Sequence, residues 1–279
     1  MQHTDLRNVN RRDFLATGLA AAGALALGGR SAFAHDHGFG PFKVGLQSYS
    51  LREYNAQDAL AKTKDLGVHY WESYSKHTPI DVSKAAAAKE MAAGSEVKVI
   101  GFGVSAFTKD HDANRKIFEF GKALGVDYLS ADPTPDAFDS LDKLVEEYDI
   151  AIGIHNHGPG HRWAKIDTIA AAIKDHHKLV GVCVDAGHFL RSSEDPVRAV
   201  EVFGKRTYGV HLKDVKDAKT FTILGEGDLR VAALLQALAK NDYQYCLAVE
   251  YEENPKDPIA DIHKCLDAVR AAVKSLKTA

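Results

Sequence analysis

From residue 42 to the C-terminus, the sequence alternates between short apolar runs and longer segments that mix apolar and polar residues. An apolar run of about four to eight residues predicts a buried strand, and apolar residues three and four apart predict an amphipathic helix. The predicted strands cover residues 42–49, 70–74, 97–104, 126–131, 150–155, 180–185, 207–211 and 245–250. The predicted helices cover residues 56–66, 82–93, 114–124, 136–148, 164–174, 196–203, 229–240 and 258–276.

This regular alternation predicts an α/β fold, because strands separated by helices of this length pair in parallel. Strand–helix units of this number, in roughly 250 residues, predict a (β/α)₈ TIM barrel. A doubly wound open sheet is the alternative. That fold calls for a glycine-rich phosphate turn after the first strand, and residues 47–52, Gln-Ser-Tyr-Ser-Leu-Arg, are not such a turn. No linker interrupts the pattern, so residues 35–279 are expected to form one domain.

The first residues predict a targeting segment and not part of the fold. Arg11 and Arg12 precede an apolar stretch over residues 15–27, and Ala32-Phe33-Ala34 matches a cleavage site. We expect a twin-arginine export signal over residues 1–34 and a periplasmic or secreted protein. The apolar stretch is shorter than the ~20 residues that span a bilayer, so no stable membrane association is expected after cleavage. An uncleaved anchor or a disordered tail is the alternative.

The charge and cysteine content narrow the class of protein. A formal net charge of −3 provides no basic footprint for nucleic acid. The cysteines at positions 183, 246 and 265 are too few and too scattered for a disulfide framework. A small-molecule carbohydrate is the expected partner, and a homo-oligomer stays possible.

Four predicted strands end in a residue that can bind a metal ion, namely His155, Asp185, His211 and Glu250. The carboxyl ends of the strands meet at one face of a barrel, so these side chains are expected to converge. Buried charges are costly unless they are paired or coordinate a metal. Carboxylates with imidazoles suit a divalent ion such as Mn, Zn, Co or Mg. The alternatives are a polar cluster without a metal and, for His155, a role in orienting a ligand.

The two-residue period of a strand predicts which other side chains share the inward face. The residues below the four candidate ligands are all small, which leaves room for a polar cluster above them; they are Gly153, Cys183, Gly209 and Ala248. On the second strand, Tyr70, Glu72 and Tyr74 share one face and Trp71 is expected to face the helices. Glu72 and Lys213 are candidates for moving protons at the rim.

Further candidates for contact with substrate are Gln47 at the end of the first strand and residues of the loop after the fifth. His157, Arg162 and Trp163 lie in that loop, where an aromatic ring beside a cation suits a sugar. Ordinary surface packing is the alternative for Arg162 and Trp163.

Short motifs at the ends of the last strands resemble the sugar phosphate isomerase/epimerase family, the xylose-isomerase-like TIM barrels. They are Val-Asp-Ala-Gly-His at 184–188, Val-His-Leu-Lys-Asp at 210–214, Gly-Glu-Gly-Asp-Leu at 225–229 and Val-Glu-Tyr-Glu at 249–252. The resemblance extends from residue 44 to the last helix. It implies that Asp185, His211 and Glu250 are metal ligands. It also implies that His188 contacts substrate or water beside the metal, and that Lys213 is a polar residue of the site.

One position departs from this family. Many members carry a glutamate at the end of the fifth strand, as both ligand and acid/base, where this sequence has His155. An exported branch of the family is similar here. Either His155 is the fourth ligand or His157 takes its place, and the catalytic base comes from elsewhere.

These features together predict a metal-dependent carbohydrate enzyme in the periplasm that acts on the carbon next to a carbonyl. The reaction is isomerisation, epimerisation or elimination on a sugar, sugar acid or keto-sugar. One alternative is a lyase or hydrolase of 3-keto-glycosides with the same metal site. Another is a non-catalytic periplasmic sugar-binding protein. A DNA-repair endonuclease of the same superfold is opposed by the export signal and the acidic charge.

Overall fold

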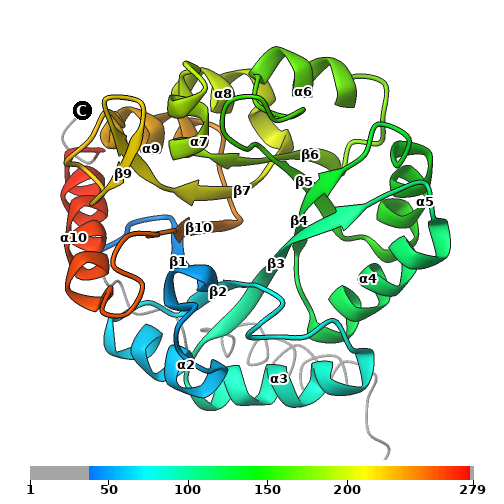
Figure 1. Ribbon diagram of the computed structural model, residues 1–279, viewed down its shortest axis with the longest axis horizontal. Coiled ribbons are helices and arrows are strands. Elements are labelled where there is room, and N and C mark those ends of the chain that lie inside the picture. The colour runs from blue at the N-terminus through cyan, green and yellow to red at the C-terminus, as the bar shows by residue number, and fades with distance from the viewer. Residues whose placement is uncertain (1–37, 277–279) are drawn as a thin grey trace, which may run out of the picture. The chain divides into compact units, whose positions relative to one another are not determined.

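The computed structural model describes residues 38–276, and these form a closed barrel of parallel strands surrounded by helices (Figure 1). The strands follow one another around the barrel in the order β1-β10-β7-β6-β5-β4-β3-β2, which confirms the predicted (β/α)₈ barrel. Their bounds are β1 Lys43–Gln47, β2 Tyr70–Ser73, β3 Lys98–Phe107, β4 Tyr128–Pro133, β5 Ala151–His155, β6 Val180–Asp185, β7 Thr207–Leu212 and β10 Cys246–Val249.

Helices connect successive strands and form the outer ring of the barrel (Figure 1). They are α2 Ala56–Asp65, α3 Val82–Gly94, α4 His111–Leu124, α5 Phe138–Tyr148, α6 Ile166–Ile173, α7 Ala186–Arg191, α8 Pro196–Phe203, α9 Val231–Lys240 and α10 Ile259–Leu276. Several begin at a side chain that accepts a backbone N–H, as Asn55 does for α2 and Asp110 for α4. Such caps satisfy donors that the first helical turn leaves unpaired. These capping residues are local sequence signals that determine where such helices begin.

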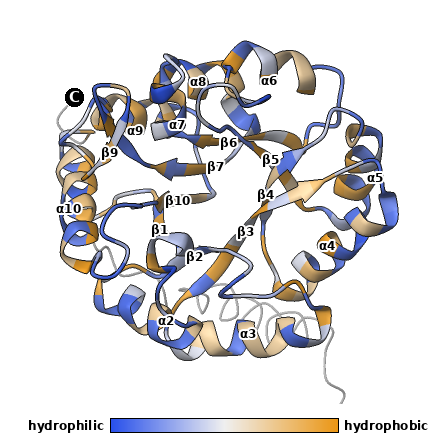
Figure 2. Cartoon of the chain, viewed as in Figure 1, coloured by the Kyte–Doolittle hydropathy of each residue, from blue (hydrophilic) through white to orange (hydrophobic). Residues whose placement is uncertain are grey.

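The main apolar core lies between the strands and the helices. Trp71 of β2 is buried there, and its Nε1 donates a hydrogen bond to Thr63 Oγ1 of α2 at 2.9 Å. The prediction that Trp71 faces the helices is confirmed. Figure 2 shows hydrophilic and hydrophobic residues along the same helices, as expected when one face packs on the strands.

A second, smaller cluster fills the barrel interior beneath the mouth. Its members are Ile100, Tyr128, Ala151, Tyr208, Cys246 and Ala248. Tyr128 occupies space that two glycines leave open. A Cβ atom at Gly101 would lie 2.4 Å from Tyr128 Cζ, and one at Gly209 would lie 2.8 Å from its Cε2. Of the small residues predicted below the candidate ligands, Gly209 therefore admits the large ring of Tyr128 from β4.

Two elements near the mouth were not predicted. The short helix α7 begins directly after β6, because the Asp185 carboxylate accepts the His188 N–H at 2.7 Å and caps it. A hairpin of β8 Asp214–Lys216 and β9 Thr220–Thr222 follows β7. Asp214 accepts backbone N–H groups from Val215, Gly225, Gly227 and Leu229, which fixes the turn at residues 225–227.

Other predictions concern the chain as a whole. The predicted export signal lies outside the described residues. Within residues 38–276, no helix has both the length and the apolar character to cross a membrane. The three cysteines are free and buried, as expected for a chain without a disulfide framework.

Candidate metal centre

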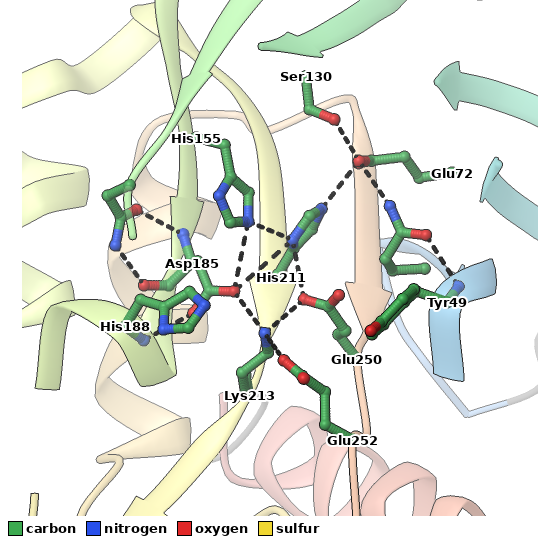
Figure 3. Close-up of polar contacts among 12 residues, drawn as sticks. Tyr49, Glu72, Ser130, His155, Asp185, His188, His211, Lys213, Glu250 and Glu252 are labelled. Atoms are coloured by element: carbon green, nitrogen blue, oxygen red, sulfur yellow. Dashed lines mark hydrogen bonds and ion pairs between the residues drawn. The ribbon is translucent and has the colours of Figure 1, made fainter. Parts of the chain in front are cut away.

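The four predicted ligands converge at the carboxyl ends of the strands (Figure 3). His155 ends β5, Asp185 ends β6, His211 lies in β7, and Glu250 follows β10 directly. His155 Nε2 lies 3.0 Å from His211 Nδ1, and His211 Nδ1 lies 3.1 Å from Glu250 Oε2. Asp185 Oδ2 lies 3.5 Å from His155 Nε2 and 3.7 Å from His211 Nδ1. All four side chains are buried.

These distances suit a shared metal ion. Ligand atoms about 2.0–2.1 Å from a tetrahedral ion lie about 3.4 Å from one another, and the measured separations of 3.0–3.7 Å surround that value. Asp185 Oδ2 and Glu250 Oε2 are buried, and both contact the Lys213 ammonium and the His211 imidazole. Two buried carboxylate oxygens beside two imidazoles form a donor set that a bound cation would also satisfy.

The charge around this point is strongly negative. The Lys213 Nζ atom lies 3.0 Å from Asp185 Oδ2, 2.8 Å from Glu250 Oε2 and 2.5 Å from Glu252 Oε1. Glu72 lies on the other side of His211. One ammonium group cannot balance these carboxylates, and a buried surplus of charge is costly. A divalent cation would reduce it, so the donor set fits a metal in charge as well as in geometry.

The carboxylates are ionised at neutral pH. Burial opposes ionisation of Asp185, but the nearby Lys213 ammonium outweighs it and holds the pKa of Asp185 well below its ordinary value. The same opposition of burial and Lys213 lowers the pKa of Glu250 to about 2. Lys213 keeps its proton, because the attraction of Asp185, Glu250 and Glu252 raises its pKa despite burial. Asp185 and Glu250 are therefore both in the ionised form that binds a metal ion.

Glu72 is not the rim residue that the sequence predicted. It is completely buried and accepts hydrogen bonds from Gln47 Nε2 at 2.9 Å, Tyr128 Oη at 2.5 Å and Ser130 Oγ at 2.5 Å. Its Oε1 also lies 3.0 Å from His211 Nε2. Four partners and no exposure leave Glu72 unable to reach a substrate. The two-residue period of the strand correctly predicted that Glu72 faces the barrel interior, but it could not predict how deeply Glu72 is buried.

The contact with Glu72 gives His211 a defined orientation. A carboxylate beside Nε2 favours a proton on that nitrogen, which leaves the Nδ1 lone pair facing the other ligands. Burial opposes a charged imidazole, but the carboxylates of Glu72 and Glu250 outweigh it and raise the pKa of His211 well above its ordinary value. Without a metal ion both ring nitrogens therefore keep a proton at neutral pH, and a cation bound at Nδ1 would take the place of the proton on that nitrogen.

A pocket of about 280 Å³ opens above the centre. Its lining combines polar groups with an apolar wall; the residues are Gln47, Tyr49, Tyr74, Ser75, Gly103, Val104, His155, His157, His188, Lys213, Glu250 and Glu252. Drug-sized ligands occupy pockets of about 300–1,000 Å³, so this one suits a small molecule. Tyr49 and Tyr74 pack edge to face with ring centres 5.4 Å apart.

His157 and His188 are the neutral polar groups of the pocket. Burial lowers the pKa of His157 to about 3 and that of His188 to about 4. The ring of His157 lies 4.6 Å from that of His155, centre to centre. Both imidazoles therefore stay neutral at neutral pH and can hydrogen-bond a substrate hydroxyl, and burial makes them weaker bases than a free histidine.

Three of the residues predicted to contact substrate are used within the protein. Gln47 lines the pocket, but its amide bonds Glu72 and the Tyr49 N–H. Trp163 is not at the pocket: it is buried, and its Nε1 donates to the Pro133 carbonyl at 2.9 Å. Arg162 pairs with Asp132 at 3.1 Å and is not a lining residue. Both side chains instead contact the last two residues of β4, Asp132 and Pro133.

Some lining residues were missed by the sequence prediction. Glu252 shares the inward face with Glu250 by the two-residue period, so that period could have identified it. Asn156 follows the last residue of β5 and exchanges two hydrogen bonds with the Asp185 backbone, at 2.8 and 2.9 Å. The sequence prediction did not single out Tyr49, which lies in the 3₁₀ helix Ser48–Leu51 after β1, or Val104, which lies in the outer part of β3.

Comparison with known families agrees with this architecture. The family model described as "Xylose isomerase-like TIM barrel" matches residues 60–269. An uncharacterized protein from Parabacteroides distasonis has 26% sequence identity and a TM-score of 0.65, covering 83% of this chain and 99% of that one. A D-tagatose 3-epimerase-like protein superposes with a TM-score of 0.68 over 85% of this chain and 100% of its own. At 18% identity, it shows the shared fold alone.

Curated relatives cover a smaller part of the chain. An inosose dehydratase from Mesomycoplasma hyopneumoniae is 28% identical over 153 residues, which are 47% of this chain and 51% of the relative. The inosose dehydratase from Clostridium tetani is 29% identical over 135 residues, 41% of this chain and 45% of that protein. The chain thus spans about half the length of the curated relatives it matches.

Proposed function

We propose that this chain, which belongs to the xylose isomerase-like TIM barrel family, is a metal-dependent carbohydrate isomerase or epimerase. It acts on the carbon next to a carbonyl of a sugar or keto-sugar. The observation that carries the proposal is the convergence of His155, Asp185, His211 and Glu250 beneath a small pocket. A divalent cation, when bound there, would polarise the oxygen atoms of a carbonyl and its neighbouring hydroxyl.

Residues of the chain would bind the sugar and accept the proton that the reaction removes. Glu250 and Glu252 accept hydrogen bonds from sugar hydroxyls, while the rings of Tyr49 and Tyr74 face the apolar side of the sugar. A proton leaves the carbon next to the carbonyl in either reaction, and it needs an acceptor in its path. His157 and His188 line the pocket beside His155, so their position makes them the candidates for that acceptor. Such a base replaces the strand-five glutamate that many relatives carry.

A dehydratase is the second candidate, and the names of the curated relatives favour it. Dehydration begins with the same proton removal next to a carbonyl and ends with loss of hydroxide from the following carbon. Elimination from a 3-keto-glycoside uses the same first step, with the glycosidic oxygen as leaving group. All three reactions need the same residues, so only their products separate them.

Solvent exchange tests the shared step directly. The purified chain, loaded with Mn²⁺, would be incubated in D₂O with ketoses, inosose or 3-keto-glycosides, and products followed by NMR and mass spectrometry. We expect deuterium at the carbon next to the carbonyl, and no exchange after metal is removed with a chelator. Epimerised sugar would identify the isomerase, and a mass loss of water would identify the dehydratase. Sugar binding without any exchange would contradict catalysis and favour a binding protein.

A further inference from the structure

Lys213 and Arg191 are cationic side chains near the pocket, and their surroundings differ. Lys213 contacts three carboxylates. Arg191, the last residue of α7, is half-buried and pairs with no carboxylate among residues 38–276. Its Nη1 lies 3.3 Å from His188 Nδ1, and its guanidinium carbon lies 5.1 Å from the centre of the Phe221 ring. The charge of Lys213 is therefore neutralised, whereas that of Arg191 is not.

The contrast holds across the described part of the chain. Arg115, Arg162, Arg198, Arg230 and Arg270 donate to carboxylates, and Arg52 and Arg206 donate to backbone carbonyl oxygens. Arg191 instead holds its guanidinium between an aromatic ring and an imidazole. A guanidinium offers five N–H donors in a planar fork that matches a carboxylate bidentately. Most of the donors of Arg191 are thus available to a ligand.

The position of Arg191 connects it to the metal centre. The imidazole that it contacts, His188, lines the pocket and lies 5.9 Å from the His155 ring, centre to centre (Figure 3). On the other side, the loop after β5 passes close by. A Cβ atom at Gly158 would lie 3.2 Å from Arg191 Nη1, so the glycine keeps this approach to the guanidinium open. One imidazole, that of His188, thus lies between the arginine and the candidate ligand His155.

We propose that Arg191 binds the carboxylate of the substrate, and that the substrate is a sugar acid. The inference rests on the proposed carbohydrate activity and names its substrate class. The acidic cluster around Lys213 repels an anion, so an anionic group needs a separate positive anchor at the rim. Arg191 provides a single, rigid fork there. A carboxylate matches it in shape and in charge, whereas a phosphate dianion would leave one negative charge without a cation.

A purely structural role makes a different prediction. Arg191 ends α7, where a cation interacts favourably with the helix dipole, and it covers the Phe221 ring. If that were its whole role, its replacement would lower stability and affect neutral and acidic sugars equally. The difference in affinity between an acidic sugar and its neutral counterpart therefore distinguishes substrate binding by Arg191 from a purely structural role.

Calorimetry on the full chain loaded with Mn²⁺ provides the test, using glucose and glucuronate, galactose and galacturonate, and glucose 6-phosphate. We expect at least one acid to bind about 10- to 100-fold more tightly than its neutral partner. Arg191→Gln should abolish this ratio, and Arg191→Lys should keep part of it because the charge remains. Arg230→Gln is the matched control, since Arg230 pairs with Asp195 at an exposed position. Thermal unfolding would verify that each variant folds.

Three results would overturn the proposal. They are acids that bind no better than their neutral partners, a preference that survives Arg191→Gln, and a preference for glucose 6-phosphate alone. Metal content, measured on the same samples, separates this failure from that of the proposed function. A chain that holds metal and exchanges protons on neutral sugars would retain its function and lose only the assignment of Arg191.

Discussion

The two ring nitrogens of His211 face opposite kinds of neighbour. Nδ1 faces the other candidate ligands, and Nε2 lies 3.0 Å from a buried carboxylate of Glu72. Glu72 is itself held by Gln47, Tyr128 and Ser130. This chain of contacts reaches from the barrel interior to the ligand set, so residues that never touch a substrate determine how His211 presents its lone pair.

Replacing Glu72 with glutamine tests this arrangement. Glu72→Gln keeps the size of the side chain but removes the negative charge beside His211 Nε2. We expect the affinity for Mn²⁺ or Zn²⁺ to fall about 10- to 100-fold, as is typical when a partner of a ligating histidine is lost. Competition with a fluorescent chelator measures the change. Glu147→Gln, in an exposed pair with Arg115, is the control, and equal affinity in the two variants would count against the proposed role of Glu72.

Part of the site could be predicted from single residues. Asp185, His211 and Glu250 each end an apolar run, and the topology of a parallel barrel brings such ends together. Arg162 and Trp163 could not be placed this way, because they belong to a loop of irregular structure. The sequence indicates only that the loop is polar and aromatic, while its course depends on contacts with Asp132 and Pro133.

At the scale of elements, β3 and β4 show how the barrel interior is filled. Gly101 of β3 faces the ring of Tyr128 from β4, and that ring carries the hydroxyl that bonds Glu72. The absence of a side chain on one strand thus positions a polar group on the next. Packing between strands and the orientation of the metal centre are coupled here.

A side chain at Gly101 should therefore be destabilising. In Gly101→Ala the new Cβ would lie 2.4 Å from the Tyr128 ring, and overpacking of a core costs about 1–3 kcal/mol. Gly94→Ala is the matched control, because a Cβ there meets nothing within 4 Å and alanine favours the helix. Urea unfolding would compare the two variants. A loss of stability no greater in Gly101→Ala than in Gly94→Ala would mean that Tyr128 can move aside.

The strands and large helices were predictable, but α7 and the hairpin β8–β9 were not. Helical periodicity needs several turns to become visible, and α7 spans six residues between a strand and α8. The sequence predicts Asp185 as a metal ligand, and nothing in it indicates that the same carboxylate also caps α7. The hairpin depends on Asp214 accepting backbone donors up to 15 residues away, a pattern that no local signal reveals.

At the scale of the whole molecule, the number and spacing of strand–helix units sufficed to predict the barrel. Each unit is an independent local signal, so an error at one boundary leaves the fold unchanged. β3, for example, ends at Phe107, three residues beyond its predicted end, without altering the strand order. The prediction of the candidate site tolerates less error than that of the fold, because a shift of one residue in a strand moves a ligand to the opposite face.

The export signal proposed for residues 1–34 can be tested in a bacterium with a twin-arginine pathway. We expect protein recovered from the periplasm to begin at His35, after cleavage behind Ala34. Replacing both Arg11 and Arg12 with lysine should keep it in the cytoplasm. N-terminal sequencing of each fraction measures both effects. Recovery of the uncleaved chain from the cytoplasm alone, with the arginines intact, would contradict the signal.

Metal stoichiometry tests the central claim most directly. The purified chain would be dialysed against Mn²⁺, Zn²⁺, Co²⁺ or Mg²⁺, then against metal-free buffer, and its metal content determined by elemental analysis. We predict about one tightly held ion per chain for at least one of these metals, and loss of that ion in Asp185→Asn and His211→Ala. Asp142→Asn, which alters a pair with His176 outside the site, should keep it. The account would be contradicted by a wild-type chain that retains no metal after any of these dialyses. It would also be contradicted if Asp185→Asn and His211→Ala retained as much metal as the wild-type chain.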